Sequence, residues 1–171
     1  MIKKSIYIIL LSFLMVSCGS SKNISTYKKP KKVKNTSASS INNPTIADKV
    51  VWTAVTYKGV PYRYGGMTRR GMDCSGLIYT SFKQRNVTVP RTSREMYTKS
   101  RDISLRNVKR GDLLFFKTSR KRGKVNHVGL VTSINNGNIK FIHSTTSRGV
   151  LVTSLYSDYW KKAFIKAKRI L

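Results

Sequence analysis

The sequence predicts an α+β domain in which a helix that carries a cysteine packs on a small antiparallel β-sheet. Up to about residue 96, apolar residues recur mainly at helical spacing, whereas short apolar runs bounded by turn residues follow from residue 113 onward. Helices that precede strands, rather than alternating with them, are typical of this class. The third observation is chemical. Cys74 lies where a helix begins, and the only two histidines, His127 and His143, lie in strand-like segments.

The N-terminal residues are expected to lie outside this domain. Two lysines, an apolar run over 6–16 and small residues over 17–21 have the three-part plan of an export signal, and the run is too short to span a membrane. Residues 14–18, Leu-Met-Val-Ser-Cys, resemble the lipobox of bacterial lipoproteins. This resemblance implies a signal peptide over 1–17 and lipid attachment to Cys18. Because Gly19 follows it and not aspartate, we expect the periplasmic face of the outer membrane.

Composition separates a tether from the domain and limits the partners. Residues 18–43 contain few large apolar side chains, so we expect a flexible basic tether, followed by one domain over 44–171. The Lys28–Lys32 cluster either contacts an anionic membrane or wall, or is simply solvated. The net charge of +28 favours anionic wall polymers or lipid headgroups. We do not expect nucleic acid as a partner, because the chain has an export signal and no nucleic-acid motif.

The cysteine count excludes two other kinds of site. With Cys18 assigned to lipid attachment, the domain holds a single cysteine, so it has no internal disulfide. One cysteine and two histidines without short metal-ligand spacing do not make a closed zinc site. We therefore expect no metal and no cofactor. Separately, we expect a monomeric protein.

The helical half contains three expected helices and one loop. Residues 44–59 predict an amphipathic helix capped by Thr45, and glycines punctuate a loop over 60–71. Residues 75–85 predict the helix with Cys74 in its first turn, where backbone amides and the helix dipole favour a thiolate. A short helix over 91–96 should be capped by Thr92 or Ser93.

The strands bring the two histidines together. We expect strands over 113–116, 127–134, 139–143, 150–153 and 164–170, with a basic loop over 117–126. Asn-Asn-Gly-Asn at 135–138 is a hairpin signal, so the strands that contain His127 and His143 should pair antiparallel. Both rings then reach one groove at the seam between helix and sheet, which is papain-like geometry.

Each of these residues also has a structural interpretation. A lone cysteine is often a buried apolar residue, and a histidine in an apolar strand is often a satisfied core residue. A thiol nucleophile, however, needs an imidazole or a helix N-terminus to lower its pKa, and its base needs a polar residue that holds the ring. The ordered set of one cysteine and two histidines supplies all of these parts, so we favour catalysis.

Six segments resemble the NlpC-type cell-wall peptidases, a papain-like family that cuts peptide bonds in bacterial peptidoglycan. The similarity runs from about residue 50 to residue 171, and the six segments occur in the order found in the family. They are 59–66 (GVPYRYGG), 73–77 (DCSGL), 89–93 (VPRTS), 110–116 (RGDLLFF), 126–130 (NHVGL) and 141–144 (FIHS).

The resemblance implies a role for each matching residue. Cys74 is the expected nucleophile, His127 the base and then the acid, and His143 the residue that orients His127. Tyr62, with the Cys74 backbone amide, is expected to stabilise the oxyanion.

Four further residues are expected to bind substrate: Asp73, Ser75, Tyr64 and Arg91. The resemblance places Asp73 and Ser75 near the amine end of the substrate. Arg91 has an alternative role as an ion-pair partner of Glu95 or Asp112.

The resemblance implies a lipid-anchored endopeptidase that acts on stem or cross-link peptides of peptidoglycan. Two alternatives stay open. An amidase would separate the peptide from the sugar, and a wall-binding scaffold would keep the fold without catalysis.

Overall fold

The computed structural model describes residues 43–119 and 124–171. The expected signal peptide, the lipid-attachment residue Cys18 and all but the last residue of the expected tether lie outside these ranges. Across the two ranges, no helix has both the length and the apolar character that crossing a membrane requires.

The helical half begins with α1 (Ile46–Val55), α2 (Cys74–Lys83) and α3 (Ser93–Lys99). Thr45 caps α1 in a reciprocal capping box with Asp48, as expected for Thr followed three residues later by an acid. Thr92 caps α3, which settles the choice between Thr92 and Ser93. Part of the expected loop over 60–71 forms a short hairpin, in which β1 (Met67–Thr68) pairs with β2 (Gly71–Met72).

An antiparallel six-stranded sheet forms the second half of the part that the structure describes, in the order β3-β8-β4-β5-β6-β7. The expected strands are confirmed, with small differences at their ends. The strands are β3 (Arg101–Ile103), β4 (Leu113–Phe116), β5 (His127–Asn135), β6 (Asn138–Thr145), β7 (Gly149–Ser154) and β8 (Phe164–Arg169). The sequence did not predict β3, the short 3-10 helix at Leu105–Asn107 or α4 (Asp158–Ala163).

The turn between β5 and β6 is the one that the sequence predicted. Asn136 and Gly137 both have positive φ, 48° and 77°, which is the conformation that a two-residue type I′ turn requires. Asn135 pairs with Asn138 across this turn, and Leu130 pairs with Ile142 farther along the hairpin. This register places His127 and His143 near the same end of the sheet.

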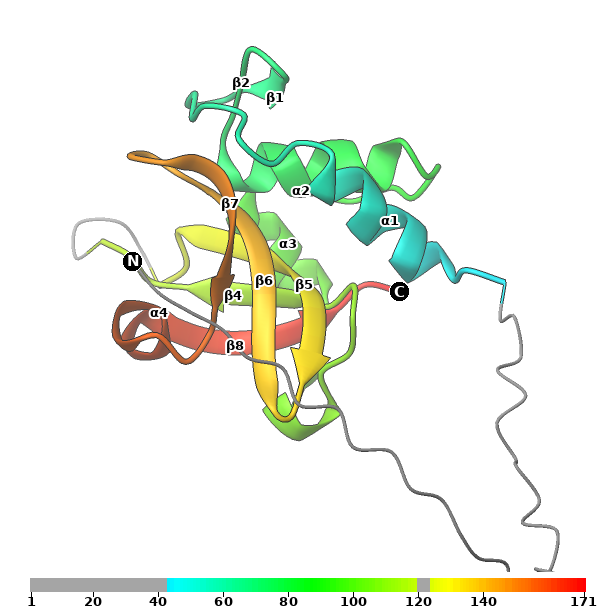
Figure 1. Ribbon diagram of the computed structural model, residues 1–171, viewed down its shortest axis with the longest axis vertical. Coiled ribbons are helices and arrows are strands. Elements are labelled where there is room, and N and C mark those ends of the chain that lie inside the picture. Colours follow the sequence, from blue (N-terminus) through cyan, green and yellow to red (C-terminus); the bar gives the residue numbers. More distant parts are fainter. Residues whose placement is uncertain (1–42, 120–123) are drawn as a thin grey trace, which may run out of the picture. The chain divides into compact units, whose positions relative to one another are not determined.

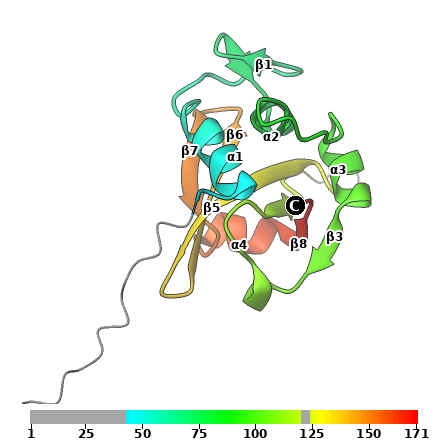
Figure 2. The same ribbon diagram turned by 90° about the vertical axis from the view of Figure 1, so that its right-hand side faces the viewer.

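The sheet buries apolar side chains on both faces. Along β4, Leu113 and Phe115 pack into the core under the helices, whereas Leu114 and Phe116 pack into a second core that contains Trp160 of α4. This alternation follows from the two-residue period of a strand. Figures 1 and 2 show α1 and α2 together at one end of the strands, with α4 beside β8. The α+β prediction, with the nucleophile helix on an antiparallel sheet, is confirmed.

Candidate active site

Cys74 is the first residue of α2. Asp73 precedes it with extended backbone and caps the helix, and its Oδ1 accepts from the Gly76 backbone N–H at 2.6 Å. Residues at a helix start keep backbone N–H groups that have no partner inside the helix. The sulfur also accepts a hydrogen bond from the Val128 backbone, and Cys74 keeps part of its surface exposed.

The two histidines form a hydrogen-bonded chain with Thr153. His127 Nε2 lies 2.9 Å from His143 Nδ1, and His143 Nε2 lies 3.0 Å from Thr153 Oγ1. With Nε2 of His127 engaged in this way, Nδ1 is the ring nitrogen that is available to the Cys74 proton. Neutral His127 then carries its hydrogen on Nε2, and His143 Nδ1 accepts it. His143 in turn donates from Nε2 to Thr153.

An aromatic wall encloses the histidine pair. Trp160 stacks on His127 with centroids 5.2 Å apart and meets the His143 ring edge to face at 4.5 Å. Phe141 packs on His143, and Phe116 packs on His127. These rings exclude water from the bond between the histidines, which strengthens its electrostatic component. Sequence reasoning missed Trp160 because α4 is short, although Ser157 and Asp158 give a helix-start signal.

Burial sets the protonation of the resting site. It raises the pKa of the Cys74 thiol to about 11, and the Asp73 carboxylate also raises it, despite the opposing Val128 hydrogen bond. Burial lowers the pKa of His127 to about 4. It also lowers the pKa of His143, helped by the charges of His127 and Arg148. Burial of the thiol thus opposes the lowering of its pKa that backbone amides at the helix start favour, because a thiolate loses hydration when it leaves water.

A neutral thiol and a neutral imidazole therefore coexist at neutral pH. If the sulfur attacks a substrate, its proton needs an acceptor, so the predicted role of His127 as a general base requires proton transfer during the reaction itself. With these pKa values, the thiol and the imidazole do not form an ion pair in the resting site.

Replacing Thr153 with valine should lower kcat about tenfold, with KM nearly unchanged. Valine keeps the branched shape but removes the oxygen that accepts from His143, so the ring loses the bond that sets its orientation. Steady-state kinetics measures the effect, and Thr153→Ser, which restores the hydroxyl, is the matched control. Equal kcat for the valine and serine variants would contradict this role.

Asp73, Ser75 and Arg91 form one polar cluster. The Arg91 guanidinium donates to both Asp73 oxygens, at 3.1 and 2.9 Å, and to Ser75 Oγ at 2.9 Å. Asp73 Oδ2 also accepts from the Gly65 backbone N–H at 2.9 Å. The ion-pair partner of Arg91 is thus Asp73, and not Glu95 or Asp112. Because both oxygens of Asp73 have partners, its contact with substrate stays a prediction, as do those of Ser75 and Arg91.

Two cavities meet at Tyr62, Cys74 and Asn126. The first, of about 860 Å³, is lined by His127, Thr153 and Trp160 among others, and we call it the histidine-side cavity. The second, of about 750 Å³, is the arginine-side cavity. Its walls include Tyr64, Asp73, Ser75 and Arg91.

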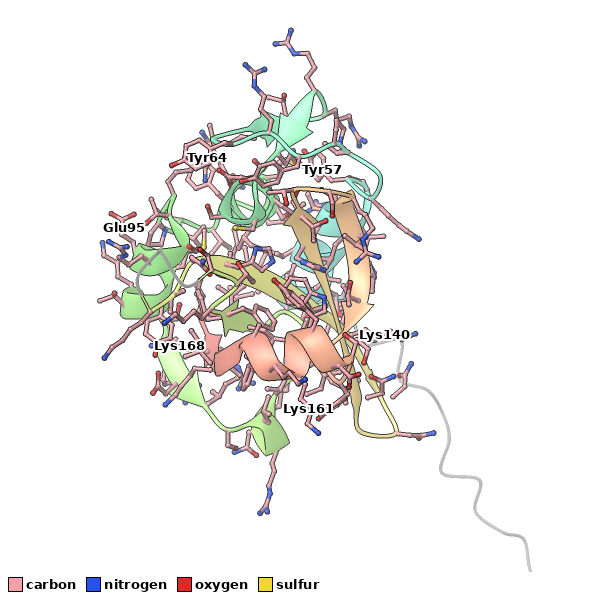
Figure 3. The ribbon with its side chains drawn as sticks, turned by 90° about the vertical axis from the view of Figure 1, so that its left-hand side faces the viewer. Tyr57, Tyr64, Glu95, Lys140, Lys161 and Lys168 are labelled. Carbon is pink, nitrogen blue, oxygen red and sulfur yellow. The ribbon has the colours of Figure 1, made fainter. Side chains whose placement is uncertain are left out.

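The predicted site residues of the domain thus lie together around one cleft. Tyr64 is 79% exposed, and Figure 3 shows it near the β1–β2 hairpin. The role of Tyr62 at the oxyanion stays a prediction, and Cys18 lies outside the described residues. Between 43 and 119 and between 124 and 171, no group of three or more His, Cys, Asp or Glu side chains is placed to hold a metal ion.

Comparisons with known proteins identify the family of this chain. The profile of the NlpC/P60 family matches residues 59–169, a segment that contains all six motifs. The probable endopeptidase NlpC of Escherichia coli strain K12 is 40% identical over 116 residues, which cover 67% of this chain and 72% of that protein. The murein DD-endopeptidase MepS/murein LD-carboxypeptidase of the same strain is 33% identical over 132 residues, 77% of this chain and 66% of the relative.

A solved structure shares the fold. It is a protein similar to a lipoprotein of the NLP/P60 family from Staphylococcus aureus, with a TM-score of 0.65 and 29% identity. The match covers 76% of this chain and 44% of that protein. The chain thus spans less than half of the Staphylococcus protein and just under two thirds of MepS. The papain-like fold expected from the motifs is confirmed.

Proposed function

Because the chain belongs to the NlpC/P60 family, we propose that it is a cysteine peptidase that cuts amide bonds in peptidoglycan peptides. Relatives named as murein endopeptidases support this substrate class. The observation that carries the proposal is the hydrogen-bonded chain from His127 through His143 to Thr153, in the same cavity as Cys74. We further propose stem or cross-link peptides as the substrate.

Catalysis begins when the Cys74 sulfur attacks the amide carbon and its proton moves to His127 Nδ1. The new S–C bond places negative charge on the former carbonyl oxygen. The Cys74 backbone N–H and the Tyr62 hydroxyl are the proposed donors to this oxyanion. His143 holds the positively charged His127 ring in position through the 2.9 Å bond.

The tetrahedral intermediate then collapses toward a thioester. The C–N bond breaks, and His127 gives its proton to the departing amine. Water next attacks the thioester carbon while His127 Nδ1 takes a proton from that water. When the S–C bond breaks, the sulfur takes this proton back, and the carboxylic acid product leaves.

We also propose that lipid on Cys18 anchors the protein after cleavage of residues 1–17, at the periplasmic face of the outer membrane. The lipobox-like segment 14–18 and the following Gly19 support this placement. Exposed cations such as Lys140 and Lys161 project from the domain in Figure 3 and suit an anionic wall or lipid surface. In this arrangement residues 18–43 let the domain reach the wall, and the protein acts as a monomer.

Digestion of purified peptidoglycan by the full chain, followed by mass analysis of the fragments, tests the function. We expect newly freed amino groups within stem or cross-link peptides. Cys74→Ala should lower their release at least about 10³-fold, because no nucleophile is left. Cys18→Ala is the matched control, since it removes the chain's other cysteine, for which no catalytic role is proposed.

Two results would overturn this proposal. Release of the same fragments by Cys74→Ala and wild type would exclude the thiol mechanism. Products in which the peptide begins with the L-Ala that had been joined to the sugar's lactyl group would instead identify an amidase.

A further inference from the structure

A cation without a carboxylate partner lies in the turn between β6 and β7. Arg148 is the only Lys or Arg among the described residues that line the histidine-side cavity. Several hydroxyl side chains share this wall: Thr145, Thr146, Ser147 and Ser157. We propose that Arg148 binds a carboxylate of the peptide substrate, so that the histidine-side cavity takes an acidic part of the peptide. This inference rests on the proposed peptidase function.

Carboxylates are scarce in this protein, and the ion pairs use other cations. The chain has 34 Lys and Arg but only six Asp and Glu. Four of the six carboxylates form ion pairs: Asp48 with Arg110, Asp73 with Arg91, Asp102 with Lys166 and Lys168, and Asp112 with Arg169. Within residues 43–119 and 124–171, none pairs with Arg148. Its guanidinium lines the cavity without a carboxylate partner among the described residues, and a guanidinium can give a ligand two parallel N–H donors, the geometry that suits a carboxylate.

The backbone that carries Arg148 is held firmly in place. Gly149 has φ +62°, and a Cβ built there would lie 2.2 Å from the Val60 carbonyl oxygen, so the turn packs directly on that segment. Gly59 N–H donates to Val150 O at 2.8 Å, and Val150 N–H donates to Val60 O at 2.9 Å. The Arg148 backbone N–H donates to Thr145 Oγ1 at 3.2 Å. A fixed turn lowers the entropy lost when a ligand binds.

Arg148 is also close enough to the catalytic pair to affect it. After burial and the charge of His127, its positive charge is the third cause of the lowered pKa of His143. A carboxylate held by Arg148 would thus lie in the same cavity as the reacting amide. Stem peptides supply such groups, because a γ-linked glutamate keeps its α-carboxylate and the peptide ends in another.

Binding to the full chain with Cys74→Ala tests the inference without turnover. The probes are cross-linked stem-peptide dimers, unmodified or with one carboxylate at a time converted to a carboxamide. With Arg148 present, we expect one amidated dimer to bind about tenfold more weakly than the unmodified dimer. Arg148→Gln should weaken binding of the unmodified dimer by a similar factor. This variant should then bind the unmodified and the amidated dimer equally well. Arg106→Gln, an exposed arginine outside both cavities, is the matched control.

The outcomes separate the inference from the proposed function. If wild type cuts the dimers but Arg148→Gln keeps full affinity, or keeps the discrimination, Arg148 does not bind a carboxylate. If wild type neither binds nor cuts the dimers, the proposed function fails and this inference fails with it. Calorimetry measures the affinities, and circular dichroism checks that each variant is folded.

Discussion

Replacing His127 with alanine should lower kcat/KM on wall peptides by about 10²–10⁴-fold, because the thiol then loses its general base. Burial keeps the Cys74 thiol protonated at neutral pH, with a pKa of about 11. The sulfur can therefore attack only if its proton has an acceptor at hand. His143→Ala keeps this acceptor but frees its ring to rotate, so we expect a smaller loss, of about tenfold to a hundredfold.

The pH profile of the wild type tests the same role. Only neutral His127 can accept the proton, and burial lowers its pKa to about 4 from an ordinary value of 6.5. Activity that depends on this base should therefore persist below pH 6.5 and decline toward pH 4. The folded state should also lose stability between pH 6.5 and 4, because the unfolded chain binds protons there more readily than the buried imidazoles do.

Unfolding must be followed over the same pH range, so that loss of the base is distinguished from loss of the fold. A decline in kcat/KM centred near pH 6.5, while the protein stays folded, would contradict the buried neutral base. A His127→Ala variant whose kcat/KM stays within tenfold of the wild-type value would also contradict the role of His127 as the base.

Replacing Asp73 with alanine should lower the free energy of unfolding by about 3 kcal/mol. The change removes the cap of α2 and the acceptor for the Gly65 backbone N–H, and it leaves the Arg91 guanidinium without its partner. The Asp73 side chain is 11% exposed, so solvent replaces these bonds poorly. Urea unfolding followed by circular dichroism measures the loss.

Asp48→Ala is the matched control for this prediction. Asp48 also belongs to a helix cap and pairs with an arginine, Arg110, but its side chain is 30% exposed. We expect a loss of about 1 kcal/mol or less there. Equal losses at the two positions would show that burial of the Asp73 cluster adds nothing to stability.

Local signals predicted most of the fold. The α2 helix start at Cys74, the Thr45 and Thr92 caps and the Asn136–Gly137 turn each depend on neighbouring residues, and the structure has all of them. The hairpin then fixes the relative position of the histidines. For this reason the sequence alone predicted that both rings would meet.

Long-range contacts could not be predicted in this way. Arg91 lies 18 residues from Asp73, and Trp160 reaches the histidines from a helix with little apolar periodicity. Thr153 carries no motif, and it became a candidate only because β7 pairs with β6 beside His143. The raised thiol pKa depends on how completely the fold buries the sulfur, which no local pattern encodes.

The active site is assembled from two parts of the chain that are distant in sequence. His127, His143 and Thr153 come from consecutive paired strands, whereas Cys74 comes from a helix more than fifty residues earlier. A chain that has formed only the β5–β6 hairpin lacks the positioned thiol, and one that has formed only α2 lacks the positioned histidines. The protein should therefore be inert until α2 has docked on the sheet and brought Cys74 to the histidines.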